Sequence, residues 1–149
     1  MRSAIVDSVI DPAVLTAEVG GGHDGNGATV LFLGTVRDTN DGRAVTGIEY
    51  SAYRSMAERE LAKIVVEAGT QFGTTDVVVE HRLGTLDLGE VSVAIAVAHP
   101  HRGAAYDASR YVIEQIKRRV PIWKREHYAD GTREWVDPTS RRTTVEAAR

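Results

Sequence analysis

Two kinds of hydrophobic pattern alternate along the chain and predict a mixture of strands and helices. Short runs rich in β-branched residues have the alternation or continuous apolarity of strands, whereas other segments repeat apolar residues at helical spacing. The predicted strands cover residues 3–10, 28–37, 44–52, 77–83 and 91–98, and the predicted helices cover residues 12–19, 55–72 and 104–119. The run 91–98, VSVAIAVA, is apolar enough to be a central strand of a sheet, on which the last helix is expected to lie.

Cap and breaker residues predict where the helices begin and end. Asp11 followed by Pro12 is typical of a helix N-terminus, because aspartate caps the first turn and proline fits its first position. Ser55 and Glu58 have the spacing of a capping box at the start of the second helix. Pro121 is expected to end the third helix, since the residue before a proline avoids the helical region.

Polar and glycine-containing segments predict the turns. The Gly-rich loop 20–27 lacks the Lys-Ser/Thr ending of a phosphate-binding loop and is interpreted as a connector. The segment DTNDGR, residues 38–43, is expected to form the long tip of a hairpin between the second and third predicted strands. Asp130-Gly131 lies between two β-type runs and predicts another hairpin with a type I′ turn.

Length and composition favour a single soluble domain. The chain has 149 residues, of which 42% are hydrophobic and 26% are charged, as is typical of a globular protein with one core. We expect this domain to cover residues 1–138 and a flexible tail to cover residues 139–149. No segment has the apolar length of a membrane helix or the pattern of a signal peptide, so a cytoplasmic location without membrane association is expected.

The absence of cysteine and the net charge restrict the chemistry. Without cysteine the chain has no disulfide, thiolate nucleophile or cysteine-ligated metal, so any sulfur chemistry needs a sulfur donor from outside the chain. The net charge of −3 argues against a general nucleic-acid binder, since such proteins present a broadly basic surface. A local site for an anion is still compatible with this charge.

One stretch near the C-terminal end departs from the acidic average. IKRRVPIWKREHY, residues 116–128, contains five cations between Lys117 and Arg125. Lys117 falls at the border of the apolar stripe of its predicted helix, and Lys124 lies beyond the proline that ends it. If the two amines converge on one pocket, each lowers the pKa of the other towards the range of a base or nucleophile. The alternative is a group of solvated cations favoured by the C-terminal dipole of the helix.

Two other positions place cations or histidines at the ends of predicted strands. His99, His101 and Arg102 lie between a strand and a helix, where free amides favour a phosphate or carboxylate; the alternative is a capped, exposed loop. His99 and His101 alone form a weak metal motif, so no metal is expected. Arg37 ends another strand, where its guanidinium suits an oxyanion or is simply exposed at a hairpin tip.

These separate positions share one property. They are cations, or residues able to become cations, near the ends of predicted elements in an otherwise acidic chain, namely Arg37, His101, Arg102, Lys117 and Lys124. A small and highly anionic substrate bound by all of them would explain the pattern.

Six ordered blocks of sequence resemble one known family. In chain order they are FLGTVR (32–37), EYSAYRSMAERELAKI (49–64), HRLGTLDLGE (81–90), AHPHRGAAYDA (98–108), IKRRVPIWKRE (116–126) and ADGTREWV (129–136). Together they resemble the catalytic large subunit of molybdopterin synthase from about residue 3 to residue 137. Six blocks in the same order are far more specific than any one of them.

The resemblance implies an α+β fold of the α/β hammerhead type, with a mostly antiparallel sheet, helices packed on it and an additional small β-subdomain. It implies an enzyme of molybdenum cofactor biosynthesis that converts cyclic pyranopterin monophosphate (precursor Z) to molybdopterin. It also implies a partner, a small ubiquitin-like sulfur-carrier subunit whose C-terminal Gly-Gly thiocarboxylate delivers the two sulfurs. Two large subunits are expected to form a homodimer within a heterotetramer, and no cofactor is expected.

Motif by motif, the resemblance assigns roles to residues of this chain. Lys117 and Lys124 match the two catalytic lysines of the family. The implied substrate-binding residues are Thr35, Val36, Arg37, His101, Arg102, Lys117, Lys124, Arg125 and Glu126. We expect them to gather in one electropositive cavity, either within one chain or with some supplied across the dimer, while the role of His99 is left open.

Two functions of other classes remain open at this point. The cations of residues 117–125 also suit a non-catalytic module that binds a partner or an RNA backbone. A phosphohydrolase with a metal at His99 and His101 is the other alternative, which chelation of the metal would test.

Overall fold

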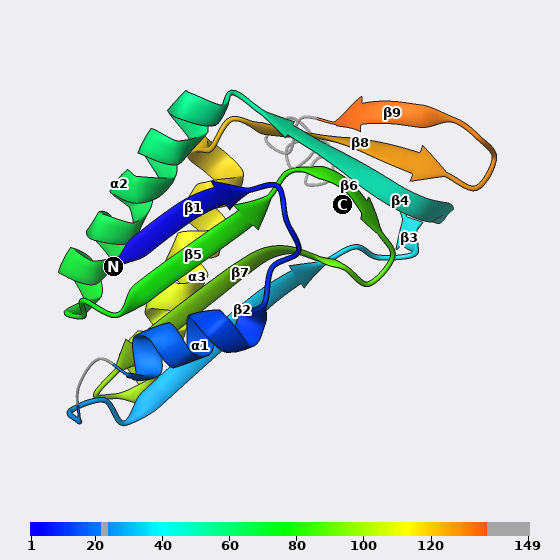
Figure 1. Cartoon of the computed structure of the whole chain (residues 1–149). Helices are drawn as coiled ribbons and strands as arrows, with labels where there is room; N and C mark the ends of the chain where they lie inside the picture. The colour runs from blue at the N-terminus through cyan, green and yellow to red at the C-terminus, as the bar shows by residue number, and fades with distance from the viewer. Residues whose placement is uncertain (22–23, 137–149) are drawn as a thin grey trace.

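The computed structural model describes residues 1–21 and 24–136 (Figure 1). Its strands are β1 (Arg2–Val6), β2 (Ala28–Thr35), β3 (Thr39–Asn40), β4 (Arg43–Ala52), β5 (Val77–Arg82), β6 (Gly84–Asp87), β7 (Val91–His99), β8 (Ile122–Tyr128) and β9 (Arg133–Val136). Its helices are α1 (Pro12–Gly20), α2 (Arg54–Phe72) and α3 (Arg102–Arg119). The strands form two sheets, antiparallel except for one pair, and the expected α+β class is confirmed.

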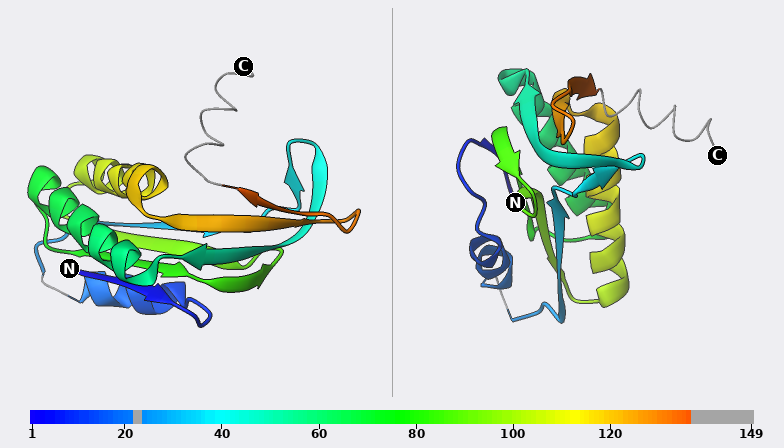
Figure 2. Two further views of the ribbon diagram at one scale, coloured as in Figure 1. Left: turned by 90° about the horizontal axis from the view of Figure 1, so that it is seen from above. Right: turned by 90° about the vertical axis from the view of Figure 1, so that its right-hand side faces the viewer.

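The helices pack on a four-stranded sheet with the strand order β1-β5-β7-β2. β7 pairs antiparallel with β5 and β2, whereas β1 and β5 are parallel. All residues of β7 after the first are buried, so its predicted central place is confirmed. α2 and α3 cover one face of this sheet and α1 covers the other (Figure 2).

The alternation of side chains along β7 explains why helices can cover both faces. Its branched residues join the core under α2 and α3, namely Val93, Ile95 and Val97. Its small residues join the core under α1, namely Ala94, Ala96 and Ala98. Because alanine side chains are short, Leu15 and Val19 of α1 can pack closely on this face of the sheet.

A second sheet of five strands follows the order β3-β4-β8-β9, with β6 paired to β4 as well. β8 comes directly after α3 through Val120 and Pro121, so the C-terminal end of α3 is tied to this sheet. A small core holds the sheet together and consists of Val36, Val45, Ile48, Leu86 and Tyr128. This second sheet corresponds to the additional β-subdomain that the resemblance implied.

The predicted hairpin between residues 28–37 and 44–52 is wrong. β2 pairs with β7 in the first sheet, and β4 pairs with β8 in the second. The segment between them contains β3, which turns back on β4 at Asp41 and Gly42. These two residues have φ values of 50° and 76°, as a type I′ turn requires. The Asp-Gly pair of DTNDGR therefore closes a tight hairpin of its own, and hydrophobic alternation alone could not tell which strands pair.

The turn at Asp130-Gly131 also differs from the prediction, although the hairpin between β8 and β9 is confirmed. Only Gly131 of this pair has a positive φ, at 88°. The backbone N–H of Tyr128 donates to the carbonyl of Thr132 at 2.9 Å, which leaves three residues in the loop. A three-residue loop places a single glycine in the left-handed region, so the type I′ assignment is wrong.

Two helix starts and one loop were also predicted incorrectly. α2 begins with Tyr53 as its N-cap, so Ser55 does not cap it, and Glu58 instead accepts a hydrogen bond from Arg54 at 3.3 Å. α3 begins at Arg102 rather than at residue 104. The segment between the predicted strands 77–83 and 91–98, for which no strand was predicted, contains β6, a short strand that pairs with β4.

The first strand ends at Val6 and not at residue 10 as predicted, but two helix boundaries agree with the prediction. Asp11 caps α1, because its carboxylate accepts a hydrogen bond from the N–H of Ala13 at 3.0 Å. α3 ends at Arg119, immediately before the residue that precedes Pro121. The predicted tail of residues 139–149 lies outside the described residues, so the division into 1–138 and 139–149 stays a prediction. Within the described part of the chain, no helix is long and apolar enough to cross a membrane.

Candidate active site

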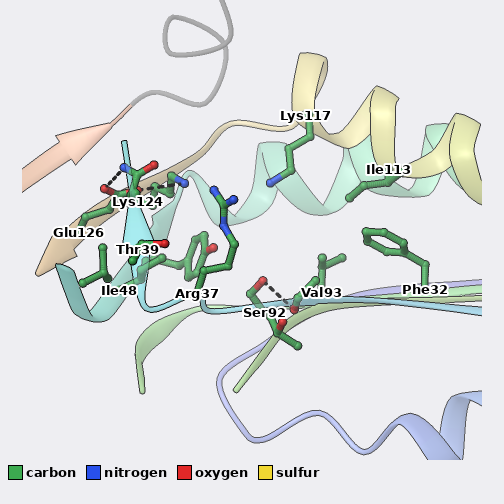
Figure 3. A pocket seen from close by; sticks show the side chains of 15 residues that line it. Phe32, Arg37, Thr39, Ile48, Ser92, Val93, Ile113, Lys117, Lys124 and Glu126 are labelled. Atoms are coloured by element: carbon green, nitrogen blue, oxygen red, sulfur yellow. Dashed lines mark hydrogen bonds and ion pairs between the residues drawn. The ribbon is translucent and has the colours of Figure 1, made fainter. Parts of the chain in front are cut away.

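A cavity of about 180 Å³ lies between the two sheets, next to the C-terminal end of α3 (Figure 3). It takes residues from β2 and the loop after it, β3, β4, β7, α3 and β8. The residues that line it are Phe32, Gly34, Thr35, Arg37, Thr39, Asn40, Val45, Ile48, Tyr50, Ser92, Val93, Ile113, Lys117, Lys124 and Glu126. Segments that are far apart in the sequence therefore build one site.

Three cations from three separate segments point into this cavity (Figure 3). Arg37 follows the end of β2, Lys117 leaves the last turn of α3, and Lys124 belongs to β8. Ile113 lies one helical turn before Lys117 and lines the same cavity, because residues four apart share a face of a helix. The predicted convergence of Arg37, Lys117 and Lys124 thus occurs within a single chain.

The choice of lysine at two of these positions is unusual for this chain. The sequence contains three lysines, at positions 63, 117 and 124, against fifteen arginines. Two of the three lysines line the cavity. A lysine can lose its proton and react as an amine, whereas an arginine stays charged, so the composition of the cavity favours amine chemistry over charge alone.

A buried carboxylate lies beside Lys124. The side chain of Glu126 is almost fully buried, and its Oε1 is 3.3 Å from the ammonium of Lys124. Its Oε2 accepts hydrogen bonds from the amide of Asn40 and from the hydroxyl of Tyr128, the latter at 2.5 Å. Lys124, Glu126 and Tyr128 alternate along β8 and share one face of it, so the strand itself places them together.

Polar groups without charge also lie at this cavity. Tyr50 and Ser92 line it, and the hydroxyl of Ser92 donates to the carbonyl of Gly34 at 3.2 Å. Burial raises the pKa of Tyr50, and a hydrogen bond with Ser92 opposes this effect, while the charge of Glu126 adds to it. Tyr50 therefore stays a neutral phenol.

His81 supports Tyr50 from the interior. Its ring packs edge-on against the ring of Tyr50 at 5.3 Å, and its Nδ1 donates to the carbonyl of Arg82 at 3.0 Å. Burial lowers the pKa of His81 to about 4, and the positive charge of Lys117 contributes, against the hydrogen bond to Arg82. His81 is therefore neutral at physiological pH and adds no positive charge next to the lysines.

The structure separates other predicted site residues from the cavity. Thr35 lines it, but its neighbour Val36 is buried in the core of the second sheet. Arg125 lies on the opposite face of β8 from Lys124, where it pairs with Glu49 at 2.8 Å and lies over the ring of Trp135. Val36 and Arg125 thus have structural contacts in this chain.

His101 and Arg102 lie at the other end of α3 from the cavity. They line a separate shallow hollow together with Gly103 and Tyr106. Lys117 lies fifteen positions after Arg102, which is about 22 Å along a helix. Within one chain, the structure does not bring these two residues together with the lysines.

His99 has a structural position. It is buried, its Nε2 donates to the carbonyl of Phe72 at 2.9 Å, and its Nδ1 accepts the backbone N–H of His101 at 2.8 Å. Both ring nitrogens are therefore committed to the protein. Among the residues that the structure describes, no group of three metal-ligating side chains is clustered.

Several cavity residues were missed by the sequence analysis. Ser92 had a signal, since it is a polar residue within the apolar run of β7. Asn40 precedes the Asp-Gly pair that closes the first hairpin, and that pair was assigned to a loop. Tyr50 and Phe32 had no separate signal, because a place on the cavity side depends on strand pairings that the sequence does not specify.

Comparisons with known proteins point to one family. The family model described as MoaE protein matches residues 5–119. The molybdopterin synthase catalytic subunit of Halalkalibacterium halodurans is 43% identical over 132 residues, which cover 89% of this chain and 79% of the relative. The crystal structure of molybdopterin synthase from Staphylococcus aureus matches with a TM-score of 0.81 and 38% identity, covering 89% of this chain and 94% of that one.

A more distant structure shares the fold. It is the complex of subunits 1 and 2 of the molybdopterin-converting factor from Helicobacter pylori, whose matched chain is 21% identical, with a TM-score of 0.72 and coverage of 90% and 89%. The family match covers most of the chain, and the relative from H. halodurans is well above the identity at which relationship is in doubt. The chain therefore belongs to the MoaE family, in which its curated relatives are molybdopterin synthase catalytic subunits.

Proposed function

We propose that this chain is the subunit of molybdopterin synthase in which sulfur is inserted into the pterin. It converts cyclic pyranopterin monophosphate to molybdopterin, and the two sulfurs come from the thiocarboxylated C-terminus of a small carrier subunit. The observation that carries the proposal is the convergence of Lys117, Lys124 and Arg37 on one cavity of a chain without cysteine. Such a site supplies charge and amines, while the sulfur arrives with a partner.

The cations of the cavity suit both reactants. The substrate carries a phosphate, and the carrier ends in a thiocarboxylate, so both are anions that ammonium and guanidinium groups bind well. Phe32, Val93 and Ile113 give the cavity an apolar side, which suits the flat ring of a pterin. The cavity thus combines an anion-binding part with an apolar part.

Each sulfur transfer has a simple balance of atoms. The sulfur of the thiocarboxylate forms a bond to a carbon of the pterin side chain as the bond from that carbon to an oxygen breaks, which gives a thioester between carrier and substrate. The displaced oxygen takes up a proton and leaves as water, or stays on the phosphate that it was bound to. Water then adds to the acyl carbon and the acyl carbon–sulfur bond breaks. The carrier leaves as a carboxylate and the sulfur stays on the substrate. Both the attack and the bond cleavage need protons moved and an oxyanion stabilised.

Lys117 is proposed as the group that moves the proton or accepts the acyl group transiently. Neighbouring positive charge favours the neutral form of an amine, and Arg37 and Lys124 share the cavity with Lys117. Lys124 and Arg37 stabilise the phosphate and the oxyanion that develops at the acyl carbon. Lys124 is held beside the carboxylate of Glu126, which suits a group that stays charged.

The proposed assembly is a homodimer of this chain with one small subunit at each end. The complex of two subunits known for the relative from H. pylori supports the small partner. His101 and Arg102 lie too far from Lys117 to join its cavity within one chain. We place them in the cavity of the second copy, where Arg102 adds positive charge for the substrate.

Two alternative functions have less support from the structure. An RNA-binding module needs an exposed row of cations, but Arg119 pairs with Glu60 at 2.8 Å, and Lys117 and Lys124 face the cavity. A metal-dependent phosphohydrolase needs free nitrogens on His99 and His101, and those of His99 are bonded to backbone groups.

Reconstitution tests the proposed function directly. The purified chain is mixed with a thiocarboxylated small subunit and cyclic pyranopterin monophosphate, and the dithiolene product is measured by mass spectrometry. We expect product from the wild type and at least about tenfold slower turnover from Lys117→Ala, since one lost charged contact is worth about 1.5–3 kcal/mol. Lys63→Ala is the control, because Lys63 is exposed on α2. Normal product formation by Lys117→Ala would remove Lys117 from its role.

A further inference from the structure

Both oxygens of the Glu126 carboxylate have partners, and the two oxygens have partners of different kinds. Oε2 accepts from Asn40 and from Tyr128, which leaves Oε1 for the ammonium of Lys124 at 3.3 Å. Only 1% of Glu126 is exposed, and 20% of the Lys124 side chain is exposed. Asn40, Glu126 and Lys124 all line the cavity, but Glu126 is almost fully buried, and the ammonium of Lys124 is the more exposed end of this ion pair.

Asn40 is brought to Glu126 by the type I′ hairpin. The turn at Asp41 and Gly42 folds β3 back on β4, so that Asn40 pairs with Arg43 and lies 8% exposed at the cavity. A two-residue turn fixes the register of a hairpin. The hairpin thus determines where the amide of Asn40 lies.

Tyr128 is held by the core of the second sheet and by Arg43, as well as by its polar neighbours Asn40 and Glu126. It is buried in the core of the second sheet, and the guanidinium of Arg43 lies 3.5 Å from the centre of its ring. Burial and the neighbouring carboxylate of Glu126 raise the pKa of Tyr128, so its hydroxyl keeps its proton and can donate. Arg43 itself is held by Thr132 at 2.6 Å, which ties this group to the second hairpin.

We propose that Asn40, Glu126 and Tyr128 form a carboxylate clamp that holds the ammonium of Lys124 in place at the cavity. The clamp rests on the proposed role of Lys124, and it changes the role of Glu126 from substrate binding to positioning. Asn40 and Tyr128 become positioning residues that act on the substrate through Glu126 and Lys124.

The physical reason lies in the flexibility of lysine. Its four-carbon chain has many rotamers, and a single ion pair at a partly exposed site holds it only weakly. Two donors on Oε2 stop the carboxyl group from rotating, so Oε1 keeps one position and the ammonium has a fixed partner. A charge held in place before the substrate binds stabilises the transition state without reorganisation.

The clamp is tested by nuclear magnetic resonance of the lysine side chains. Because the sequence has three lysines, a protein labelled with [ε-¹³C]lysine gives three ε-methylene signals. The two protons of an ε-methylene group differ when the side chain is held in one rotamer and become equivalent when it rotates freely. Lys63, exposed on α2, supplies the signal of a free lysine in the same sample.

We expect the two ε-protons of Lys124 to have different chemical shifts in the wild type. We expect them to have the same chemical shift in Tyr128→Phe, Asn40→Ala and Glu126→Gln. The signals of Lys117 and Lys63 are expected to stay unchanged, which shows that the fold is intact. Tyr111→Phe is the matched control, since that ring packs on Phe72 instead of meeting Glu126. An unchanged Lys124 signal in all three variants, or equal changes of all three lysines, overturns the clamp.

Measurements of kcat distinguish a failure of the clamp from a failure of the proposed function. In the reconstituted reaction, Tyr128→Phe is expected to lower kcat by about tenfold, and to have no further effect in a Lys124→Ala background. If Tyr128→Phe releases Lys124 in the spectra but leaves kcat unchanged, the clamp stands and the proposed catalytic role of Lys124 is wrong. If Tyr128→Phe lowers kcat equally with and without Lys124, the hydroxyl does not act through Lys124 and the clamp is wrong.

Discussion

Lys117 leaves the last turn of α3 one turn after Ile113, and both side chains line the cavity. Its position follows from the helix, because the apolar stripe that packs α3 on the sheet also fixes which face carries Lys117. The residue is exposed towards the cavity, so its amine can meet a substrate. Whether an amine or only a positive charge is required can be decided by one substitution.

Lys117→Arg keeps the charge but replaces the amine with a group that does not lose its proton. We expect the variant to bind the substrate nearly as well as the wild type, with a turnover at least about tenfold lower. Single-turnover kinetics with thiocarboxylated partner, together with substrate binding by calorimetry, measure both quantities. Lys63→Arg is the control. Turnover equal to that of the wild type would show that Lys117 acts through charge alone.

His81 gives a prediction for the pH dependence of stability. Its pKa is about 4 in the folded chain and about 6.5 in an unfolded one, so the unfolded state binds more protons between these values. The contribution of His81 to the free energy of unfolding is complete above about pH 6.5. It is lost as the pH falls towards 4, by about 3 kcal/mol in total. Urea unfolding at pH 7 and pH 4.5 measures this loss.

His81→Gln removes the titrating group and is the comparison for that measurement. The variant is expected to be less stable than the wild type at pH 7, because the ring no longer packs on Tyr50. Its loss of stability between pH 7 and pH 4.5 is expected to be smaller. An equal loss in both proteins would mean that His81 is not the group responsible.

At the scale of elements, the hairpin of β3 and β4 is needed for the clamp, because it brings Asn40 to Glu126. Gly42 has a φ of 76°, a conformation that costs a residue with a side chain about 1–2 kcal/mol. Gly42→Ala is therefore expected to lower the free energy of unfolding by about that amount, measured by urea titration. Gly42→Ala is also expected to give the two ε-protons of Lys124 the same chemical shift.

Gly103→Ala is the matched control for the hairpin. Gly103 lies in the first turn of α3, where a Cβ has open space around it and the backbone conformation is ordinary. Alanine favours a helix more than glycine does, so this change is expected to be neutral or stabilising. A loss of stability equal to that of Gly42→Ala would show that the turn conformation is not the cause.

Most elements could be predicted from the sequence, because helical and strand periodicities are local properties. β7, α2 and α3 carry long apolar patterns, and their predicted positions agree with the structure within a few residues. Pairing is not local, and the hairpin assigned to β2 and β4 was wrong for this reason. β6 was missed because four residues are too few to show a period.

The candidate site could be predicted in part for the same reason. Arg37, Lys117 and Lys124 stood out as cations at element ends, and the structure gathers them. Asn40 could not be predicted, because its contact with Glu126 depends on the pairing of β3 with β4 and of β4 with β8. Tyr128 shares one face of β8 with Glu126, but the sequence does not say which face of that strand lies at the cavity. A match to a known motif indicates which residues are candidates for the site, but it does not say which way their side chains point. Arg125, for example, matches the motif but pairs with Glu49 instead.

At the scale of the whole molecule, the proposed dimer makes a distinctive prediction. If Arg102 serves the cavity of the second copy, Lys117→Ala in one chain and Arg102→Ala in its partner fall in the same site of a mixed dimer. One of its two sites then has both defects and the other has none. Two inactive variants are therefore expected to regain activity when they are co-expressed and purified as a mixed dimer.

The measurement is product formation by the mixed dimer compared with each parent alone. Wild-type activity at one site in each mixed dimer is expected. A mixed dimer that stays as inactive as its parents would show that Arg102 acts on its own chain or on the fold. Size-exclusion chromatography with light scattering establishes that the variants are dimers before the rates are compared.

The cavity takes its walls from segments that begin at Phe32 and end at Glu126. During synthesis on the ribosome, the strand that brings Lys124 and Glu126 emerges near the end of the described chain. A nascent chain with its first sheet already folded thus has an incomplete cavity until β8 pairs with β4. Translation arrested before this strand yields a chain that cannot assemble the site, so the subunit gains its binding capacity late in synthesis.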